Sequence, residues 1–587
     1  MVLRTYPFLL LLVISLSSAA EAKQNTDSLS AIIADHWAWY LSQNPVEASA
    51  RGVRDYDDKI ADLSLAARAA QVEKMKAFVK RLEALSSKNM SEDDRVNHEV
   101  LLWMLQEDIE AHEHLAERLM LFTTYFGWHQ EFSSMADALP FYEQRDYESY
   151  LLRLARYPKQ NSDALSITRE AIRQGYVQPC SVLQNYAEGI LGIVKGPAEG
   201  TRFYEPFKRD RPRDISVADW EAMQGRAVAL IDGVLTPEYR KWHAVFVNEY
   251  LPKCRRQDGA SSLPGGKAWY ASRVRSHTTT GLSPAEIHQI GLDEVARIKN
   301  RMEKLAIDAG YATRAEYVAH LRTAPRHYAK SPEELLRAAA RQTKIIDGLM
   351  PRYFGSLPRL PYGLKPIPAA EAPTTTTAYY GPGAPESGIA GTYWLNTSKL
   401  DQRPLWELPA LTVHEAVPGH HHQIALQQEL PLPPFRKHIA GFTAYVEGWA
   451  LYTEYLGEEM GIYDTNDKMM GRLSYEMWRA CRLVVDTGLH AMGWNKERAV
   501  AFMRSNSALS EANIDAEVNR YISWPGQALG YKLGEIKIRE LRSRAEKALG
   551  AKFSLRRFHD AILQQGAIPL TVLERRFDDW LRAEPVN

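Results

Sequence analysis

The stretch HEAVPGHHHQ, residues 414–423, places a histidine–glutamate pair before a proline, a glycine and three further histidines. In the metal-binding pattern H-E-x-x-H the second histidine follows the first by four residues, so both side chains project from one helix face. Here Pro418 occupies that position, and the next histidine is His420. The stretch therefore indicates either a metal site with an unusual backbone or a histidine cluster without a metal.

A straight helix cannot bring His420 to an ion held by the first histidine, because six residues turn it off that face and separate the two by ~9 Å. Pro418 lacks the N–H of a regular helical turn, and Gly419 adopts backbone angles that other residues avoid. We predict a bulge at these two residues, inside a helix that continues to Pro431. His420 is then the second ligand, and His421 is the alternative ligand.

A third ligand is predicted in the next helical segment, KHIAGFTAYVEGWALYTEYLGEEMG (437–461). Glu447 and Glu454 are seven residues apart, which places them on one face of a helix, two turns apart. Carboxylates on an apolar, aromatic face are costly unless they are paired or bind a metal. We predict that Zn²⁺ is bound by His414, His420 and Glu447, and that Glu454 orients a ligand.

Composition and periodicity predict a mostly α fold. Of the 587 residues, 45% are hydrophobic and 25% are charged, which is typical of a globular chain, and the balance of 72 basic and 72 acidic residues argues against a nucleic-acid partner. Apolar residues recur at three- and four-residue steps over 64–85, 283–310 and 331–354. Only residues 351–396 are rich in Pro, Gly, Thr and Tyr, and there we expect two short strands, 374–380 and 391–396. The second, which contains Tyr393, would be an edge strand able to pair with an extended peptide.

The N-terminus has the features of a secretory signal. Residues 1–22 hold one basic residue, an apolar run over 8–16 and the small-x-small sequence Ala20-Glu21-Ala22. We predict a signal peptide at 1–22, one large helical domain over 23–587, and a periplasmic or extracellular location without stable membrane insertion. The three widely spaced cysteines, Cys180, Cys254 and Cys481, are interpreted as small buried residues, although an oxidising compartment would allow one disulfide.

Three motifs carry a resemblance to a known family. HEAVPGHHHQ, YVEGWALYTE and RYISWPGQALGYKLGEIKI resemble the bacterial domain-of-unknown-function 885 (DUF885) family, over most of the mature chain. More distantly, the chain is similar to carboxypeptidase Taq, angiotensin-converting enzyme and the thimet-type oligopeptidases. The resemblance implies a mostly helical, two-lobed shell around a deep cleft with a small β-sheet (gluzincin-like), a zinc ion and peptide hydrolysis. The two-residue insertion between Glu415 and the Gly419-His420 pair departs from those peptidases.

Catalytic and substrate-binding roles follow from the metal site and the resemblance. Glu415 adjoins a ligand and would take the proton of the attacking water, and in the similar peptidases a tyrosine near the C-terminal motif stabilises the oxyanion, for which we favour Tyr531. The substrate-binding candidates are Tyr393, Arg520, Tyr521, Gln527 and Lys532. We expect zinc-dependent cleavage of short peptides, by a carboxypeptidase or an oligopeptidase. The alternatives are a zinc amidohydrolase on a non-peptide amide and a metal-free periplasmic binding protein; the pattern assigns no oligomeric state.

Overall fold

The mostly α prediction is confirmed. The computed structural model describes residues 28–584 apart from 87, 89, 370–371 and 373–374, and it is 71% helical with one small sheet. The predicted signal peptide, residues 1–22, lies outside the described residues. Within the described part of the chain, none of the helices combines the length and the apolar composition that crossing a membrane requires.

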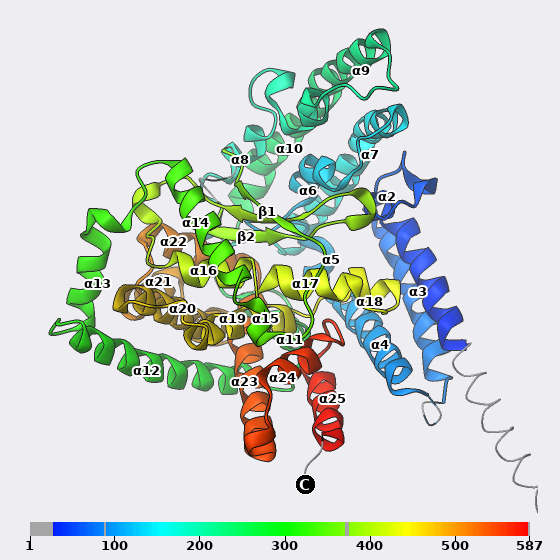
Figure 1. The fold of residues 1–587 in the computed structure, drawn as a ribbon. Coiled ribbons are helices and arrows are strands. Elements are labelled where there is room, and N and C mark those ends of the chain that lie inside the picture. Colours follow the sequence, from blue (N-terminus) through cyan, green and yellow to red (C-terminus); the bar gives the residue numbers. More distant parts are fainter. Residues whose placement is uncertain (1–27, 87, 89, 370–371, 373–374, 585–587) are drawn as a thin grey trace, which may run out of the picture.

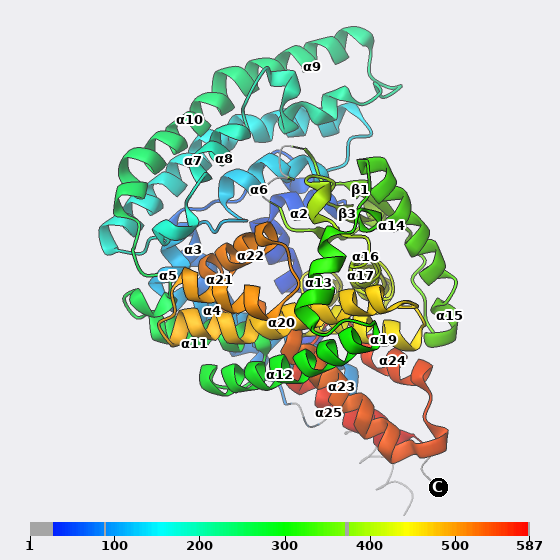
Figure 2. The same ribbon diagram turned by 90° about the vertical axis from the view of Figure 1, so that its left-hand side faces the viewer.

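Helices of the N-terminal half form two groups. Residues 28–43 are helical and precede α2 (Pro45–Ala50), α3 (Leu65–Glu83), α4 (Glu92–Glu113), α5 (Leu115–Leu119) and α6 (Trp128–Ser134). The second group is α7 (Gln144–Gln174), α8 (Tyr186–Gly192), α9 (Val217–Leu230) and α10 (Thr236–Val245). Figures 1 and 2 show that α7, α9 and α10 lie together along the top of the molecule, away from the C-terminal helices.

In the C-terminal half, α20 (Asn466–Ala491) is buried along nearly its whole length. The helices that precede the sheet in the sequence are α11 (Gly266–Thr278), α12 (Pro284–Asp308), α13 (Arg314–Thr323), α14 (Pro332–Asp347) and α15 (Met350–Tyr353). After the sheet come α16 (Leu408–Glu415), α17 (His420–Glu429), α18 (Pro434–His438), α19 (Thr443–Glu459), α20 (Asn466–Ala491), α21 (Lys496–Asn506), α22 (Glu511–Ser523), α23 (Gly530–Leu549), α24 (Leu555–Leu563) and α25 (Leu570–Ala583). The most extensive helix–helix packing is between α12 and α20 and between α19 and α23.

Helix starts follow the capping pattern of the sequence. Ser64 caps α3, and Ser283 forms a reciprocal capping box with Glu286 at the start of α12. The helix predicted over 331–354 is wrong as one element, because α14 ends at Asp347 and a separate short helix, α15, follows. Pro351 lies in the first turn of α15, where its missing N–H costs nothing, whereas it cannot continue α14.

The sheet has three strands rather than the two predicted. β1 (Tyr362–Pro366) lies parallel to β3 (Gly391–Leu395), and β2 (Ala378–Gly381) lies antiparallel to it, in the order β1-β3-β2. The strand expected at the edge is therefore the central one, and the prediction that its backbone pairs with a peptide is wrong. The flanking prolines and Gly363 hid β1 in the sequence, since these residues are depleted in strands.

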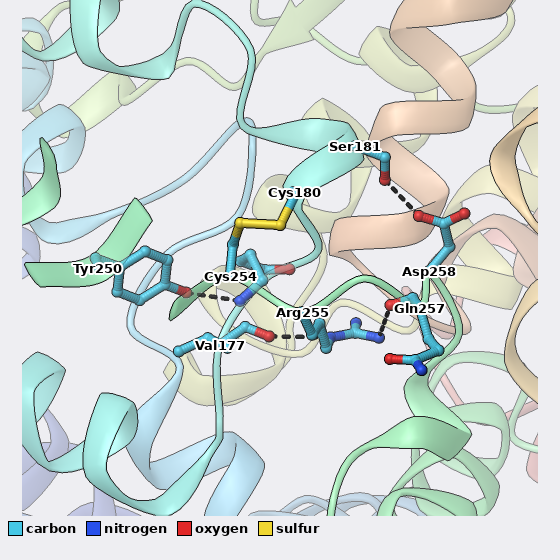
Figure 3. Close-up of a disulfide and its surroundings, with 9 residues drawn as sticks. Val177, Cys180, Ser181, Tyr250, Cys254, Arg255, Gln257 and Asp258 are labelled. Atoms are coloured by element: carbon cyan, nitrogen blue, oxygen red, sulfur yellow. Dashed lines mark hydrogen bonds between the residues drawn. A yellow bond between two sulfur atoms is a disulfide. The ribbon is translucent and has the colours of Figure 1, made fainter. Parts of the chain in front are cut away.

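A disulfide joins the segment that follows α7 to the segment that precedes α11. Cys180 and Cys254 are bonded, with their Cα atoms 5.1 Å apart, while Cys481 is free and buried in α20. The interpretation of all three as small buried residues is thus wrong for two of them. Around the bridge the Cys180 amide donates to the Arg255 carbonyl (2.9 Å), and the Arg255 guanidinium donates to the Val177 carbonyl (2.9 Å) (Figure 3). The bridge and Arg255 together hold residues 177–180 against the loop that leads into α11.

Candidate metal centre

The helix that carries the histidine–glutamate pair ends at Glu415, and α17 begins at His420. Between them the backbone angles of Ala416 (φ −95°, ψ −117°) are not helical, and the peptide bond before Pro418 is cis. The predicted bulge within one continuous helix is therefore wrong, because residues 416–419 leave the helical path altogether. The break nevertheless places His420 at the first position of a new helix beside the end of α16.

Gly419 and α19 make this break compatible with a buried site. A Cβ atom on Gly419 would lie 1.9 Å from the carbonyl oxygen of the first histidine, so no larger residue fits without a shift of the backbone. Where helical hydrogen bonding stops, carbonyl oxygens need other donors. The Thr453 hydroxyl donates to the Val413 carbonyl (3.1 Å), and the Trp449 indole donates to the Pro418 carbonyl (2.8 Å). Two side chains of α19 thus supply these donors.

The three predicted ligands meet at one point. Nε2 of His414 lies 3.6 Å from Oε2 of Glu447, and Nε2 of His420 lies 3.3 Å from the same oxygen. Two atoms bound tetrahedrally at ~2.0–2.2 Å from a zinc ion are roughly 3.3–3.6 Å apart. The Glu447 oxygen is buried and has no hydrogen-bond donor among the described residues. The spacing, the donor types and this oxygen fit a zinc ion held by His414, His420 and Glu447.

Glu454 fixes the orientation of the first histidine. Its Oε1 lies 2.8 Å from Nδ1 of His414, which directs Nε2 of the same ring toward Glu447. The Arg479 guanidinium approaches the same Oε1 to 3.3 Å, and the side chains of Glu454 and Arg479 are only 1% and 3% exposed. A carboxylate that holds the second nitrogen of an imidazole is a common partner of metal-bound histidine.

The imidazoles and the carboxylates of the site shift each other's pKa values. Burial by itself lowers the pKa of His414, but its interactions with Glu447 and Glu454 outweigh burial and raise that pKa to about 9. Burial alone would raise the pKa of Glu447, yet the imidazoles of His420 and His414 hold it well below its ordinary value. A metal ion binds neutral imidazole, so it would replace a proton here and keep the pairing of opposite charges.

Glu415 and Tyr531 lie beside these ligands. Glu415 is the last residue of α16, is buried, and has no cationic partner in the described part of the chain. The Tyr531 ring is nearly parallel to that of His414, with an angle of 12° and centroids 6.4 Å apart. Burial and the charge of Glu447 raise the pKa of Tyr531, which keeps its hydroxyl a hydrogen-bond donor. The site region therefore holds a buried carboxylate next to His414 in sequence and a hydroxyl, that of Tyr531, on a ring stacked near the His414 ring.

A close helix crossing brings Tyr531 to the site. A Cβ on Gly448 would lie 2.5 Å from the Cα of Gly534, so α19 and α23 touch through two glycines. Glu447 precedes one of them on α19, and Tyr531 lies one turn before the other on α23. Glycine at this crossing therefore sets the separation between a candidate ligand and the candidate oxyanion donor.

Comparison with known proteins assigns the family. The family described as "Bacterial protein of unknown function (DUF885)" matches residues 45–577. The chain belongs to the DUF885 family. A solved structure described as a "putative lipoprotein" from Colwellia psychrerythraea is similar, with TM-score 0.89 and 28% identity over 95% of this chain and 100% of that chain. One of the same description and of unknown function from Shewanella oneidensis has TM-score 0.68 and 18% identity, covering 94% and 99%. Among curated proteins, none matches.

Of the other two histidines of the DUF885 motif, His421 contacts the sheet and His422 packs against Phe354. Nδ1 of His421 lies 3.0 Å from the Tyr380 hydroxyl, and its ring packs on Tyr362 with centroids 4.5 Å apart. His422 is fully buried against Phe354, with ring centroids 4.6 Å apart. Burial lowers the pKa of His421 to about 4 and that of His422 to about 3. The structure does not bring the alternative ligand His421 into the group of His414, His420 and Glu447.

The predicted substrate-binding cations are occupied by carboxylates. Lys532 is fully buried, and its ammonium lies 2.8–2.9 Å from three carboxylates, those of Glu294, Glu476 and Glu535. Arg520 pairs with Glu517 at 2.9 Å, so neither cation is left for a substrate.

The remaining predicted substrate-binding residues differ in access. Tyr521 is buried and donates to Glu517 (2.7 Å), and Tyr393 is fully buried in the central strand β3. Gln527 accepts from Arg520 (2.7 Å) and lines the cavity in front of Glu447.

The candidate ligand Glu447 lines a cavity of about 740 Å³. Gln423, Trp524 and Gln527 are among its walls, whereas neither His414 nor His420 lines it. A second cavity of about 620 Å³ borders it. The two share the lining residues Tyr40, Ile439, Gly441 and Thr443.

Sequence reasoning missed Arg479, which pairs with Glu454. A signal was present in the segment 472–486, where charged residues recur every three to four positions in an otherwise apolar helix. Such charges on a buried helix require partners, and these are Arg472, Glu476, Arg479, Arg482 and Asp486. The partner of each could not be assigned from α20 alone, since most lie on other helices.

Proposed function

We propose that this DUF885 protein is a zinc-dependent peptidase that hydrolyses peptide bonds in short peptides. The observation that carries the proposal is the 3.3 and 3.6 Å spacing of the ligand atoms of His420 and His414 from one Glu447 oxygen. Such a spacing suits tetrahedral zinc, and Glu415 adjoins the first ligand as it does in H-E-x-x-H enzymes.

The chain's own residues supply the proton transfers and charge stabilisation. Bound zinc would lower the pKa of a water ligand from about 15.7 toward ~7 and polarise a carbonyl. The Glu415 carboxylate accepts a proton from the attacking water and returns it to the leaving amine. The Tyr531 hydroxyl donates a hydrogen bond to the oxygen on which negative charge develops. Glu454 holds the His414 ring in place throughout, since it binds the other ring nitrogen.

Short, unfolded substrates suit the surroundings of the site. Helices enclose the motif, and the cavity that reaches Glu447 has a volume of about 740 Å³, which accommodates a few residues of peptide. The Gly419-His420 pair and the seven-residue spacing of Glu447 and Glu454 are similar to features of carboxypeptidase Taq, and this likeness favours a peptidase. As part of this proposal, the helices form a two-lobed shell around a deep cleft that contains the site.

We infer that the protein is exported, with the periplasm as its place of action. The signal sequence at 1–22 and the Cys180–Cys254 disulfide both favour an oxidising compartment outside the cytoplasm. The description of the similar Colwellia and Shewanella chains as lipoproteins is in line with export.

The test is cleavage of a peptide library by zinc-loaded protein, followed by mass spectrometry. Glu415→Gln should bind zinc at one ion per chain yet lose several orders of magnitude in kcat, because the water has no proton acceptor. Glu459→Gln, at the exposed end of α19, is the matched control and should stay active. Full activity of Glu415→Gln, or a wild-type protein that takes up zinc but cleaves no peptide in the library, contradicts the proposal.

A further inference from the structure

One cation in the cavity in front of Glu447 has no carboxylate partner. Lys437, in α18, lines this cavity and is partly exposed. Within the described part of the chain, its ammonium makes no ion pair and no hydrogen bond. The other acidic residues of the cavity wall are already paired, Glu47 with Arg51 and Asp137 with a residue outside the wall. The charge of Lys437 is therefore available to a ligand.

A second donor lies on the wall of the same cavity. Nε of Arg51 donates to Glu47 (2.8 Å), so the opposite edge of the guanidinium makes no contact with that carboxylate. Its Nη1 is buried without a hydrogen-bond partner, and the nearest carboxylate, that of Glu386, is 3.7 Å away and 44% exposed. A guanidinium with an unused edge is suited to a carboxylate, which accepts two parallel hydrogen bonds.

Two glutamine oxygens on α17, in the wall of the same cavity, lack hydrogen-bond donors. Gln428 donates to the Gly383 carbonyl (3.0 Å), and Gln423 donates to the Gln427 oxygen (2.8 Å). Gln427 itself donates to two backbone carbonyls, so the orientation of all three amides is determined. The oxygens of Gln423 and Gln428 then remain buried without a donor, in side chains that line the cavity and belong to residues 2% and 9% exposed.

Cations and unused acceptors together match one end of a peptide. A C-terminal residue presents a carboxylate and, on the same Cα atom, an amide N–H, whereas an N-terminal residue presents an ammonium that Lys437 and Arg51 would repel. Gln423 lies three residues after His420 in α17 and so projects from the same face as this candidate zinc ligand.

We propose that Lys437 and Arg51 bind the terminal carboxylate of a peptide substrate while Gln423 and Gln428 accept its amide N–H groups. Resting on the peptidase proposal, this makes the enzyme a carboxypeptidase or a dipeptidyl carboxypeptidase. Lys437 and Arg51 thereby take the place of Arg520 and Lys532, the two cations predicted to bind substrate, since Arg520 is neutralised by Glu517 and Lys532 by three glutamates.

The test compares trialanine as the free acid and as the C-terminal amide, binding to the zinc-loaded Glu415→Gln protein by calorimetry. A hydrogen bond between charged groups corresponds to about 10- to 100-fold in affinity, so the free acid should bind tighter by that factor. Lys437→Met should reduce this preference by weakening the acid alone, Lys437→Arg should retain it, and Lys437→Met combined with Arg51→Met should abolish it. The control is Lys304→Met, an exposed lysine on α12 outside the cavity wall, which should change nothing.

Equal binding of acid and amide by the Glu415→Gln protein overturns the carboxylate site. So does a full preference that survives when both Lys437 and Arg51 are replaced by methionine, because the carboxylate would then be held elsewhere, for instance by the metal. Binding does not require turnover. A protein that prefers the acid through Lys437 but cleaves no peptide would therefore refute the peptidase proposal and leave the carboxylate site standing.

Discussion

Replacing Glu454 by glutamine isolates the part of the site that orients a ligand. The substitution keeps the size of the side chain and one acceptor for Nδ1 of His414, but it removes the negative charge. Loss of such an outer partner costs metal affinity about 10- to 100-fold, or about 1.4–2.8 kcal/mol. We therefore expect Glu454→Gln to bind zinc more weakly than wild type by that factor.

The same change also affects stability without metal. Arg479 loses its carboxylate partner while its guanidinium stays buried over the rings of Trp478 and Tyr475, at 4.2 and 4.7 Å. Breaking a buried pair costs about 3–5 kcal/mol, and the retained glutamine oxygen should hold the loss of unfolding free energy at or below ~3 kcal/mol. Glu459→Gln on the same helix breaks a partly exposed pair with Arg542, so it should cost about 0.2–1 kcal/mol.

Two assays separate these effects. Competition with a chromophoric chelator measures zinc affinity, and urea unfolding of the metal-free proteins measures stability. The control Glu459→Gln should retain wild-type zinc affinity. If folded Glu454→Gln also binds zinc as tightly as wild type, then the contact between Glu454 and His414 does not support a metal ligand, and the reasoning fails.

Two further predictions concern the helices around the site. Gly448→Ala forces a Cβ to within 2.5 Å of the Gly534 backbone, so it should cost about 1–3 kcal/mol of unfolding free energy and lower zinc affinity. The control Ala450→Gly, on the same helix, should lower stability without changing zinc affinity. Equal zinc affinity of folded Gly448→Ala and wild type would show that the crossing does not position the ligands. Elemental analysis of His420→Ala should find no stoichiometric zinc, while His421→Ala should keep one ion per chain, and the reverse result would assign the ligand role to His421.

Much of the architecture could be predicted because it depends on local patterns. Amphipathic periodicity located α3 and α12, and the paired carboxylates of one helix placed Glu447 and Glu454 on one face. The break at 418–419 was also predictable in kind, since proline and glycine disrupt a helix whatever surrounds them. How the chain passes through the break was not, because Trp449 and Thr453 of another helix supply the hydrogen bonds that the broken helix lacks.

What the sequence by itself determined is therefore the position of helices such as α3 and α12 and the types of side chain, histidine and glutamate, that meet at the site. Tertiary structure decided which histidine and which lysine lie at the site. His420 rather than His421 meets Glu447, and Lys437 rather than Lys532 keeps a free charge, because packing buries one of each pair among other partners. The central position of β3 and the pairing of Cys180 with Cys254 depend on segments distant in sequence. A local pattern cannot encode such contacts, since they form only when the whole chain closes its core.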